Sequence, residues 1–89
     1  MIEQLLKIEN RLGLHARPAA LIAQTAAKFQ SDVSLTKDQI TINAKSIMGV
    51  MMLAAEFGSS ICLKVQGTDE KEAFEALKQI FDNKFNEEF

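Results

Sequence analysis

Apolar and polar residues alternate in four short stretches of the chain, and this period of two predicts β-strands. The pattern is clearest in residues 60–66, where Ile61, Leu63 and Val65 share one face. The four stretches cover residues 2–8, 33–36, 40–42 and 60–66. Each has one apolar face, so we expect each strand to pack that face against a core.

Three other stretches carry apolar residues at the spacing of three and four that is typical of amphipathic helices. They cover residues 16–29, 47–53 and 69–86. Ser46 has the position of an N-cap for the second helix. Asp69, followed three residues later by Glu72, resembles a capping box for the third. We expect the chain to fray after Asn86.

The predicted elements follow the order βαββαβα. Strands that follow one another without long crossovers favour an antiparallel sheet, and helices then cover one face. We therefore predict an α+β fold, an open-faced β-sandwich in which a four-stranded antiparallel sheet carries three helices on one face. A chain of 89 residues can build one modest core, so residues 1–89 are expected to form a single domain.

The only histidine, His15, lies where the first helix is expected to begin. Pro18 suits a first helical turn, and the backbone N–H groups of Ala16 and Arg17 have no intrahelical acceptors there. These donors, the helix dipole and the Arg17 guanidinium together favour an anion beside a nucleophilic imidazole. We predict that His15 is phosphorylated, with the Ala16 N–H and Arg17 stabilising the phosphate. The plainer alternative is a surface histidine that only caps the helix.

The short helix after Ser46 carries more apolar residues than one buried face can hold. With Val50 turned to the core, Ile47, Met48 and Met51 are left partly outside. Exposed methionines suit a surface that docks partners, although a methionine stripe more often belongs to a core. Ser46 is a candidate regulatory phosphosite, because a phosphate there would place negative charge beside the apolar surface. The alternative is a serine that serves only as the N-cap.

Composition excludes several classes of function. A net charge of −2 without a basic stripe excludes nucleic acid as a partner, and no apolar stretch is long enough for membrane insertion. The single cysteine, Cys62, fits a reducing cytoplasm, and charged residues within the first fifteen positions disfavour a secretory signal. No histidine or cysteine pair has metal-ligand spacing, so we expect no metal and no cofactor. An enzyme acting on a phosphorylated metabolite ranks low, because no second base accompanies the histidine.

The chain resembles the HPr family along essentially its whole length. Two motifs carry the resemblance: Gly13-Leu14-His15-Ala16-Arg17-Pro18-Ala19 and Lys45-Ser46-Ile47-Met48-Gly49-Val50-Met51. That family comprises the histidine-containing phosphocarriers of the bacterial phosphoenolpyruvate-dependent phosphotransferase system. The resemblance implies a stoichiometric carrier rather than an enzyme, phosphorylated on Nδ1 of His15 by Enzyme I. It would pass the phosphoryl group to a histidine of an EIIA domain, with assistance from Arg17. The implied docking surface is formed by the first helix and the patch of Ile47, Met48 and Met51, with Ala16 and Ala20 at its edge.

The resemblance also implies control through Ser46 by an ATP-dependent HPr kinase/phosphorylase. A protein of this size that docks transiently is expected to be a monomer. His15 distinguishes the chain from the regulatory paralogue that lacks this histidine. Arg11-Leu12-Gly13 and the segment around Ile80 are similar to the nitrogen-related branch, NPr, whereas the Ser46 segment is similar to the kinase-regulated sugar branch. A sugar-transport carrier, a nitrogen-related carrier and a regulatory binding module controlled through Ser46 therefore remain the alternatives.

Overall fold

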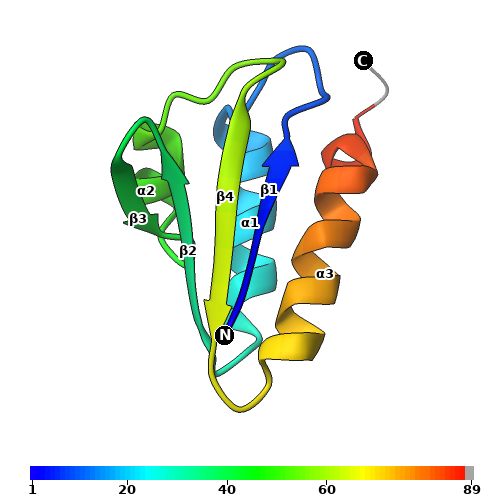
Figure 1. The fold of residues 1–89 in the computed structure, drawn as a ribbon. Helices are drawn as coiled ribbons and strands as arrows, with labels where there is room; N and C mark the ends of the chain where they lie inside the picture. Colours follow the sequence, from blue (N-terminus) through cyan, green and yellow to red (C-terminus); the bar gives the residue numbers. More distant parts are fainter. Residues whose placement is uncertain (88–89) are drawn as a thin grey trace.

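The computed structural model describes residues 1–87, and its sheet has the strand order β1-β4-β2-β3. All three neighbouring pairs are antiparallel, and the helices lie together on one face of the sheet (Figure 1). The predicted fold class and element order are confirmed. The elements are β1 (Ile2–Lys7), α1 (Ala16–Ala27), β2 (Asp32–Lys37), β3 (Ile40–Asn43), α2 (Ile47–Met52), β4 (Ser60–Gln66), α3 (Glu70–Asp82) and the short turn η1 (Lys84–Asn86).

The core lies between the sheet and the helices. Strand β4 runs through the middle of the sheet, and its inward side chains Ile61, Leu63 and Val65 are completely buried. Ile22 of α1 and Leu77 of α3 are completely buried as well. Each such side chain contributes about 1.5–3 kcal/mol by leaving water, so the alternating pattern of the sequence fixes which sheet face carries the helices.

The expected capping box at the start of α3 is wrong. The Asp69 side chain makes no cap bond within α3, and instead accepts from the backbone N–H groups of Gln30 and Ser31 and from the Ser31 hydroxyl. This contact ties the α1–β2 loop to the beginning of α3. The carboxylate accepts from backbone donors of the loop that follows α1, so it does not cap α3.

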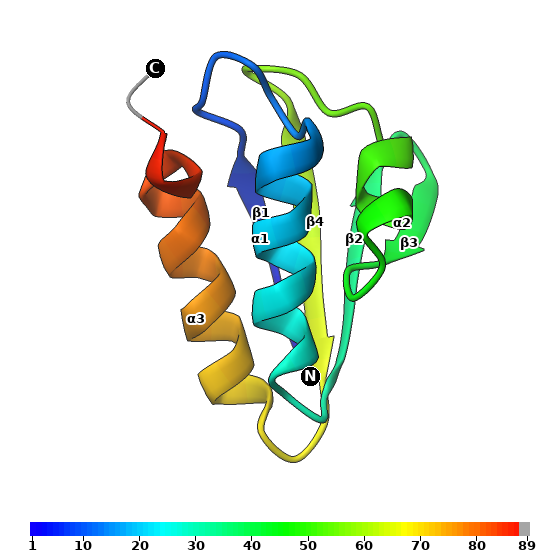
Figure 2. The same cartoon turned by 180° about the vertical axis from the view of Figure 1, so that it is seen from behind.

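The expected helix over residues 69–86 is also wrong. The chain does not fray at Glu87, which is buried, while residues 88–89 of the expected frayed end lie outside the described residues. Helix α3 ends at Asp82, and the chain then turns through η1, where all three residues have positive φ, between 54° and 61°. Phe85 of η1 is buried and packs edge-on against Phe81, with ring centroids 4.9 Å apart. This turn leads Glu87 into the protein beside the β1–α1 loop, at the end of the molecule where α1 begins (Figure 2).

Within residues 1–87, no helix is long and apolar enough to cross a membrane.

Candidate functional site

His15 is the N-cap residue of α1, and the loop before it holds it in place. Gly13 has a φ of +68°, and a Cβ there would lie 2.4 Å from the carbonyl oxygen of Ala55, so only glycine fits. Leu14 is buried, and its N–H donates to the same carbonyl at 3.0 Å. The His15 backbone is extended, and its carbonyl accepts the first intrahelical bond, from Ala19. The imidazole therefore projects from a well-anchored backbone.

The start of α1 leaves two backbone donors available next to the ring. Neither the Ala16 N–H nor the Arg17 N–H has a hydrogen-bond acceptor among residues 1–87. Pro18 has no N–H, and the N–H of Ala19 is already engaged with His15. Two free N–H groups at the positive end of a helix dipole can bind the oxygens of an anion.

A buried carboxylate occupies the other side of the imidazole. Glu87 Oε2 lies 2.8 Å from His15 Nε2, and the Glu87 side chain is only 1% exposed, against 35% for His15. The second carboxylate oxygen, Oε1, accepts from Nδ2 of Asn10 at 2.8 Å. The same Asn10 nitrogen donates to the carbonyl of Gly13, also at 2.8 Å. The loop before α1 and the segment after η1, which are distant in sequence, thus meet at the histidine.

Because a carboxylate oxygen only accepts, the hydrogen in the His15–Glu87 bond lies on Nε2. In the neutral imidazole Nδ1 then keeps its lone pair, and it makes no hydrogen bond within the described part of the chain. The arrangement presents one ring nitrogen as a nucleophile and holds the other as a donor. The sequence analysis missed Glu87 and Asn10. Glu87 is 72 positions from His15 and 77 positions from Asn10, and no local sequence pattern marks contacts over such separations.

The structure does not bring the Arg17 side chain to the histidine. Arg17 is exposed and lines a shallow hollow of about 300 Å³ beside η1, together with Ala20 and Phe85. His15 instead lines an open hollow of about 440 Å³ that Arg11 borders. Neither arginine forms an ion pair with any residue from 1 to 87. The Arg17 guanidinium therefore has no ion-pair partner among residues 1–87.

The second sequence motif folds as expected around α2. Ser46 is the N-cap, and its hydroxyl accepts from the N–H of Gly49 at 3.0 Å. Within this segment Val50 and Leu53 are the buried apolar side chains. Three side chains expected partly outside the core are indeed exposed: Ile47, Met48 and Met51. The prediction that they bind partners is not tested by their exposure.

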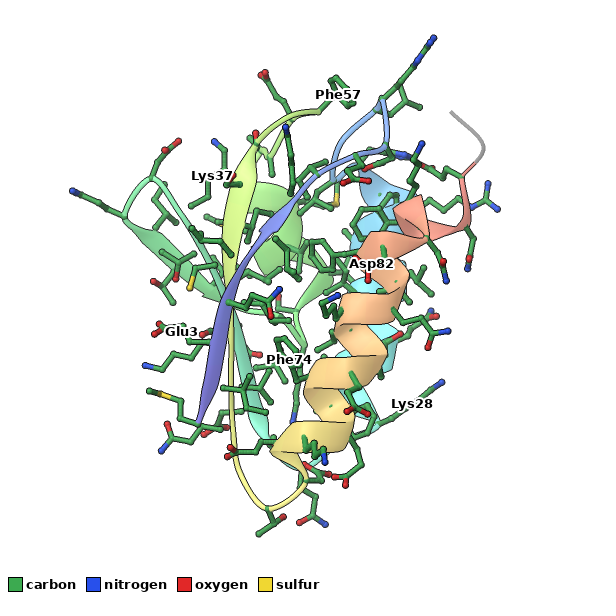
Figure 3. All side chains as sticks on the ribbon, turned by 45° about the vertical axis from the view of Figure 1, so that its right-hand side comes forward. Glu3, Lys28, Lys37, Phe57, Phe74 and Asp82 are labelled. Carbon is green, nitrogen blue, oxygen red and sulfur yellow. The ribbon has the colours of Figure 1, made fainter. Side chains whose placement is uncertain are left out.

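The exposed apolar surface is larger than the sequence indicated. Met52, Leu12 and Phe57 are also exposed, and the last two line the hollow beside His15. Figure 3 shows Phe57 projecting outward from the loop before β4, at the end of the molecule where η1 lies. Leu12 and Phe57 lie in loops, where no periodic pattern separates an exposed apolar residue from a buried one.

Cys62 is half-buried on the sheet face opposite the helices. Burial raises the pKa of its thiol, and the neighbouring Glu3 carboxylate raises that pKa further. The protonated thiol is a weak nucleophile. Among residues 1–87 no three histidine, cysteine, aspartate or glutamate side chains are grouped as metal ligands.

Comparison with known proteins gives consistent matches along the chain. Residues 2–83 match the family model described as the PTS HPr component phosphorylation site. The phosphocarrier protein HPr of Treponema pallidum is 51% identical over 88 residues, covering 99% of this chain and 100% of the relative. The HPr-like protein Crh of Bacillus subtilis is 51% identical over 77 residues, covering 86% of this chain and 91% of the relative.

Solved structures agree with these relatives. A crystal structure of HPr from Thermoanaerobacter tengcongensis superposes with a TM-score of 0.95 at 48% identity and covers all of both chains. A histidine N-cap with free donors beside it, the βαββαβα order and these full-length relatives lead to one conclusion. The chain belongs to the HPr family of phosphocarrier proteins of the phosphotransferase system.

Proposed function

We propose that the protein carries a phosphoryl group on Nδ1 of His15, accepting it from phosphorylated Enzyme I and passing it to a histidine of an EIIA domain. The observation that supports this most directly is the geometry of the ring. Nδ1 has a lone pair and no hydrogen-bond partner among residues 1–87, while Nε2 is held by Glu87. Two free N–H groups lie next to it at the helix N-terminus.

These groups match what phosphoryl transfer requires. The transferred group carries negative charge on three oxygens, so catalysis depends on positioning and on neutralising that charge. In the proposed complex the N–H groups of Ala16 and Arg17 bind phosphoryl oxygens. The Arg17 side chain, unpaired in the structure, rotates toward His15 and neutralises charge as the phosphorus passes between nitrogens.

The proposed docking surface is the exposed apolar region beside the histidine. It consists of Ile47, Met48 and Met51 on α2 and Ala20 on α1. Ser46 lies at the edge of this surface, so its phosphorylation by an HPr kinase/phosphorylase would add negative charge there. The free thiol of Cys62 is consistent with our placing the carrier in the cytoplasm.

The test is to incubate the purified chain with phosphoenolpyruvate, Mg²⁺ and Enzyme I, and to measure intact mass before and after mild acid. We expect one phosphate on the wild-type chain, its loss in acid and no phosphate on His15→Ala. Separate reactions with sugar-system and nitrogen-system Enzyme I then distinguish the two branches. An acid-stable phosphate, or one that persists in His15→Ala, would contradict the proposal.

The similarity to the HPr-like protein Crh favours one second candidate, a regulatory binding module controlled through Ser46. In this case His15 would be dispensable for binding. His15→Ala should then bind a partner as wild type does, while Ser46→Asp changes the affinity. If the protein is a carrier, His15→Ala should instead abolish phosphoryl transfer.

A further inference from the structure

We propose that Glu87 is a positioning residue for His15, whose carboxylate selects Nδ1 as the nucleophile and stabilises the ring when it is phosphorylated. This inference rests on the proposed carrier function and assigns a role to a residue outside both sequence motifs. The test is chosen so that failure of either one can be distinguished from failure of the other.

The Glu87 carboxylate is buried next to the imidazole. A charged group that is 1% exposed is stable only when hydrogen bonds replace its lost hydration. Glu87 has two such bonds, from His15 Nε2 and from Asn10 Nδ2, both 2.8 Å long. If the hydrogen moved to Nδ1, the lone pair of Nε2 would face a carboxylate oxygen at that distance. The carboxylate therefore favours the Nε2–H tautomer.

Asn10 makes the position of the carboxylate specific. Its Nδ2 donates both to Glu87 Oε1 and to the carbonyl of Gly13, and both acceptors are oxygens without hydrogens. Reversing the amide would point its own oxygen at both of them, so the observed orientation is the one that the network allows. Asn10 thus couples the carboxylate to the same glycine turn that places His15.

The turn η1 brings Glu87 to this point by an ordered route. Three consecutive residues other than glycine adopt the left-handed conformation, which costs roughly 1–2 kcal/mol for each ordinary residue and less for asparagine. Burial of Phe85 against Phe81 offsets part of that cost. The N–H of Glu87 also closes the turn, donating to the carbonyl of Lys84 at 3.0 Å.

The role follows from the electron balance of the transfer. The lone pair of Nδ1 forms the new bond to phosphorus, and the donor imidazole keeps the electron pair of its broken P–N bond. The His15 ring then bears a hydrogen on Nε2 and a positive charge. The Glu87 carboxylate faces that charge at hydrogen-bond distance, in the way a carboxylate stabilises an imidazolium in hydrolases. When the phosphoryl group leaves, the electron pair returns to Nδ1.

The test uses the full chain and two variants of Glu87. Long-range ¹H–¹⁵N NMR at alkaline pH, where the imidazole is neutral, reports the His15 tautomer without any partner. We expect Nε2–H in the wild-type chain and a mixture of tautomers in Glu87→Ala. In Glu87→Gln the amide oxygen accepts from Asn10 Nδ2 and the NH2 group faces Nε2, so we expect the Nδ1–H tautomer there. The rate of phosphorylation by phosphorylated Enzyme I should fall about tenfold to a hundredfold in both variants.

The matched control is Glu75→Ala, which removes the same charge from an exposed position on α3. It should change neither the tautomer nor the rate. A wild-type tautomer and rate in Glu87→Ala would overturn the inference, as would a wild-type chain that carries the hydrogen on Nδ1. If the tautomer responds as expected but no chain accepts phosphate, the carrier function fails while the positioning role stands. Should Glu87→Ala unfold, Glu87→Gln decides: the Nε2–H tautomer together with the wild-type rate there overturns the inference.

Discussion

At the scale of single residues, the two nitrogens of one imidazole have opposite surroundings. Nε2 faces a buried carboxylate, whereas Nδ1 has no hydrogen-bond partner among residues 1–87. A histidine that only capped the helix would place its ring against the N–H groups at the start of α1. His15 makes no such side-chain cap bond, so the donors at the start of α1 remain available for an anion.

The two arginines nearest the histidine in sequence can be compared directly. Arg17→Ala should slow phosphorylation of His15 at least about tenfold without unfolding the protein, because Arg17 is exposed and its charge acts only on the moving phosphoryl group. Rapid-quench measurement with phosphorylated Enzyme I gives the rate. Arg11→Ala removes the same charge from the rim of the His15 hollow and should have a smaller effect. A larger effect from Arg11→Ala would reverse the assignment.

Ser46 allows capping and regulation to be separated. Ser46→Ala removes the acceptor for the Gly49 N–H and should cost about 1 kcal/mol of unfolding free energy. Ser46→Asp keeps an acceptor of equal capping strength, so its melting temperature should stay near that of the wild type. Calorimetric titration with Enzyme I should nevertheless show weaker binding for Ser46→Asp. Unchanged affinity would mean that the serine is only a cap.

At the scale of elements, the β2–β3 hairpin shows how the backbone tolerates unfavourable residues. Lys37 pairs with Ile40, which leaves a two-residue loop of Asp38 and Gln39 with φ values of 51° and 69°. Two positive φ angles are the mark of a type I′ turn, for which Asp-Gly is strongly preferred. Here a glutamine occupies the position that favours glycine.

Gln39→Gly should therefore raise the free energy of unfolding by about 0.5–1 kcal/mol, because the residue is exposed and only its backbone conformation changes. Urea denaturation followed by circular dichroism measures the gain. Gln39→Val is the matched control, since a β-branched residue is more strained at positive φ and should lower stability. Equal stability of the two variants would contradict the role assigned to the turn.

The elements also show what could be predicted from the sequence. Strands and most helices were predictable, because burial on one face forces a period of two or 3.6 onto apolar residues. The end of α3 was not predictable, because Phe85 continues the helical spacing of Phe81 although the chain has left the helix. His15 could be found from the local sequence, whereas its contact with Glu87 depends on the turn η1, which the sequence pattern does not predict.

At the scale of the whole molecule, apolar side chains are exposed on two different faces. Met48 on α2 is 75% exposed beside the histidine end, and Leu5 on β1 is 68% exposed on the sheet face that carries no helices. Met48→Ala should weaken binding to Enzyme I by about fivefold, roughly 1 kcal/mol, and change stability by less than about 0.5 kcal/mol. Leu5→Ala is the control, and an equal loss of affinity there would make the docking surface non-specific.

Asp69 joins the α1–β2 loop to α3 and makes the stability of the molecule sensitive to acid. The Ser31 hydroxyl bond, followed by the Gln30 N–H bond, holds the pKa of this carboxyl below its ordinary value of 3.8. A carboxyl with a lowered folded-state pKa contributes stability above its unfolded pKa and loses that stability as pH falls through the folded value.

Asp69→Asn should accordingly be less stable than wild type at neutral pH, and the difference should shrink as the pH falls below about 4. Urea unfolding at a series of pH values measures this difference. A difference that stays constant down to about pH 2 would show that the contact does not depend on the charge of Asp69.

The two ends of the molecule differ in what a fused purification tag would disturb. The amino group of Met1 pairs with Glu70 in an exposed contact, at the end of the molecule opposite η1 (Figure 1), and such pairs contribute little to stability. A tag joined after residue 89 begins only three positions beyond Glu87 in the sequence. A polyhistidine sequence there brings extra imidazoles close to the group that holds His15. Rates measured on protein tagged before Met1 should therefore be the ones that describe the native carrier.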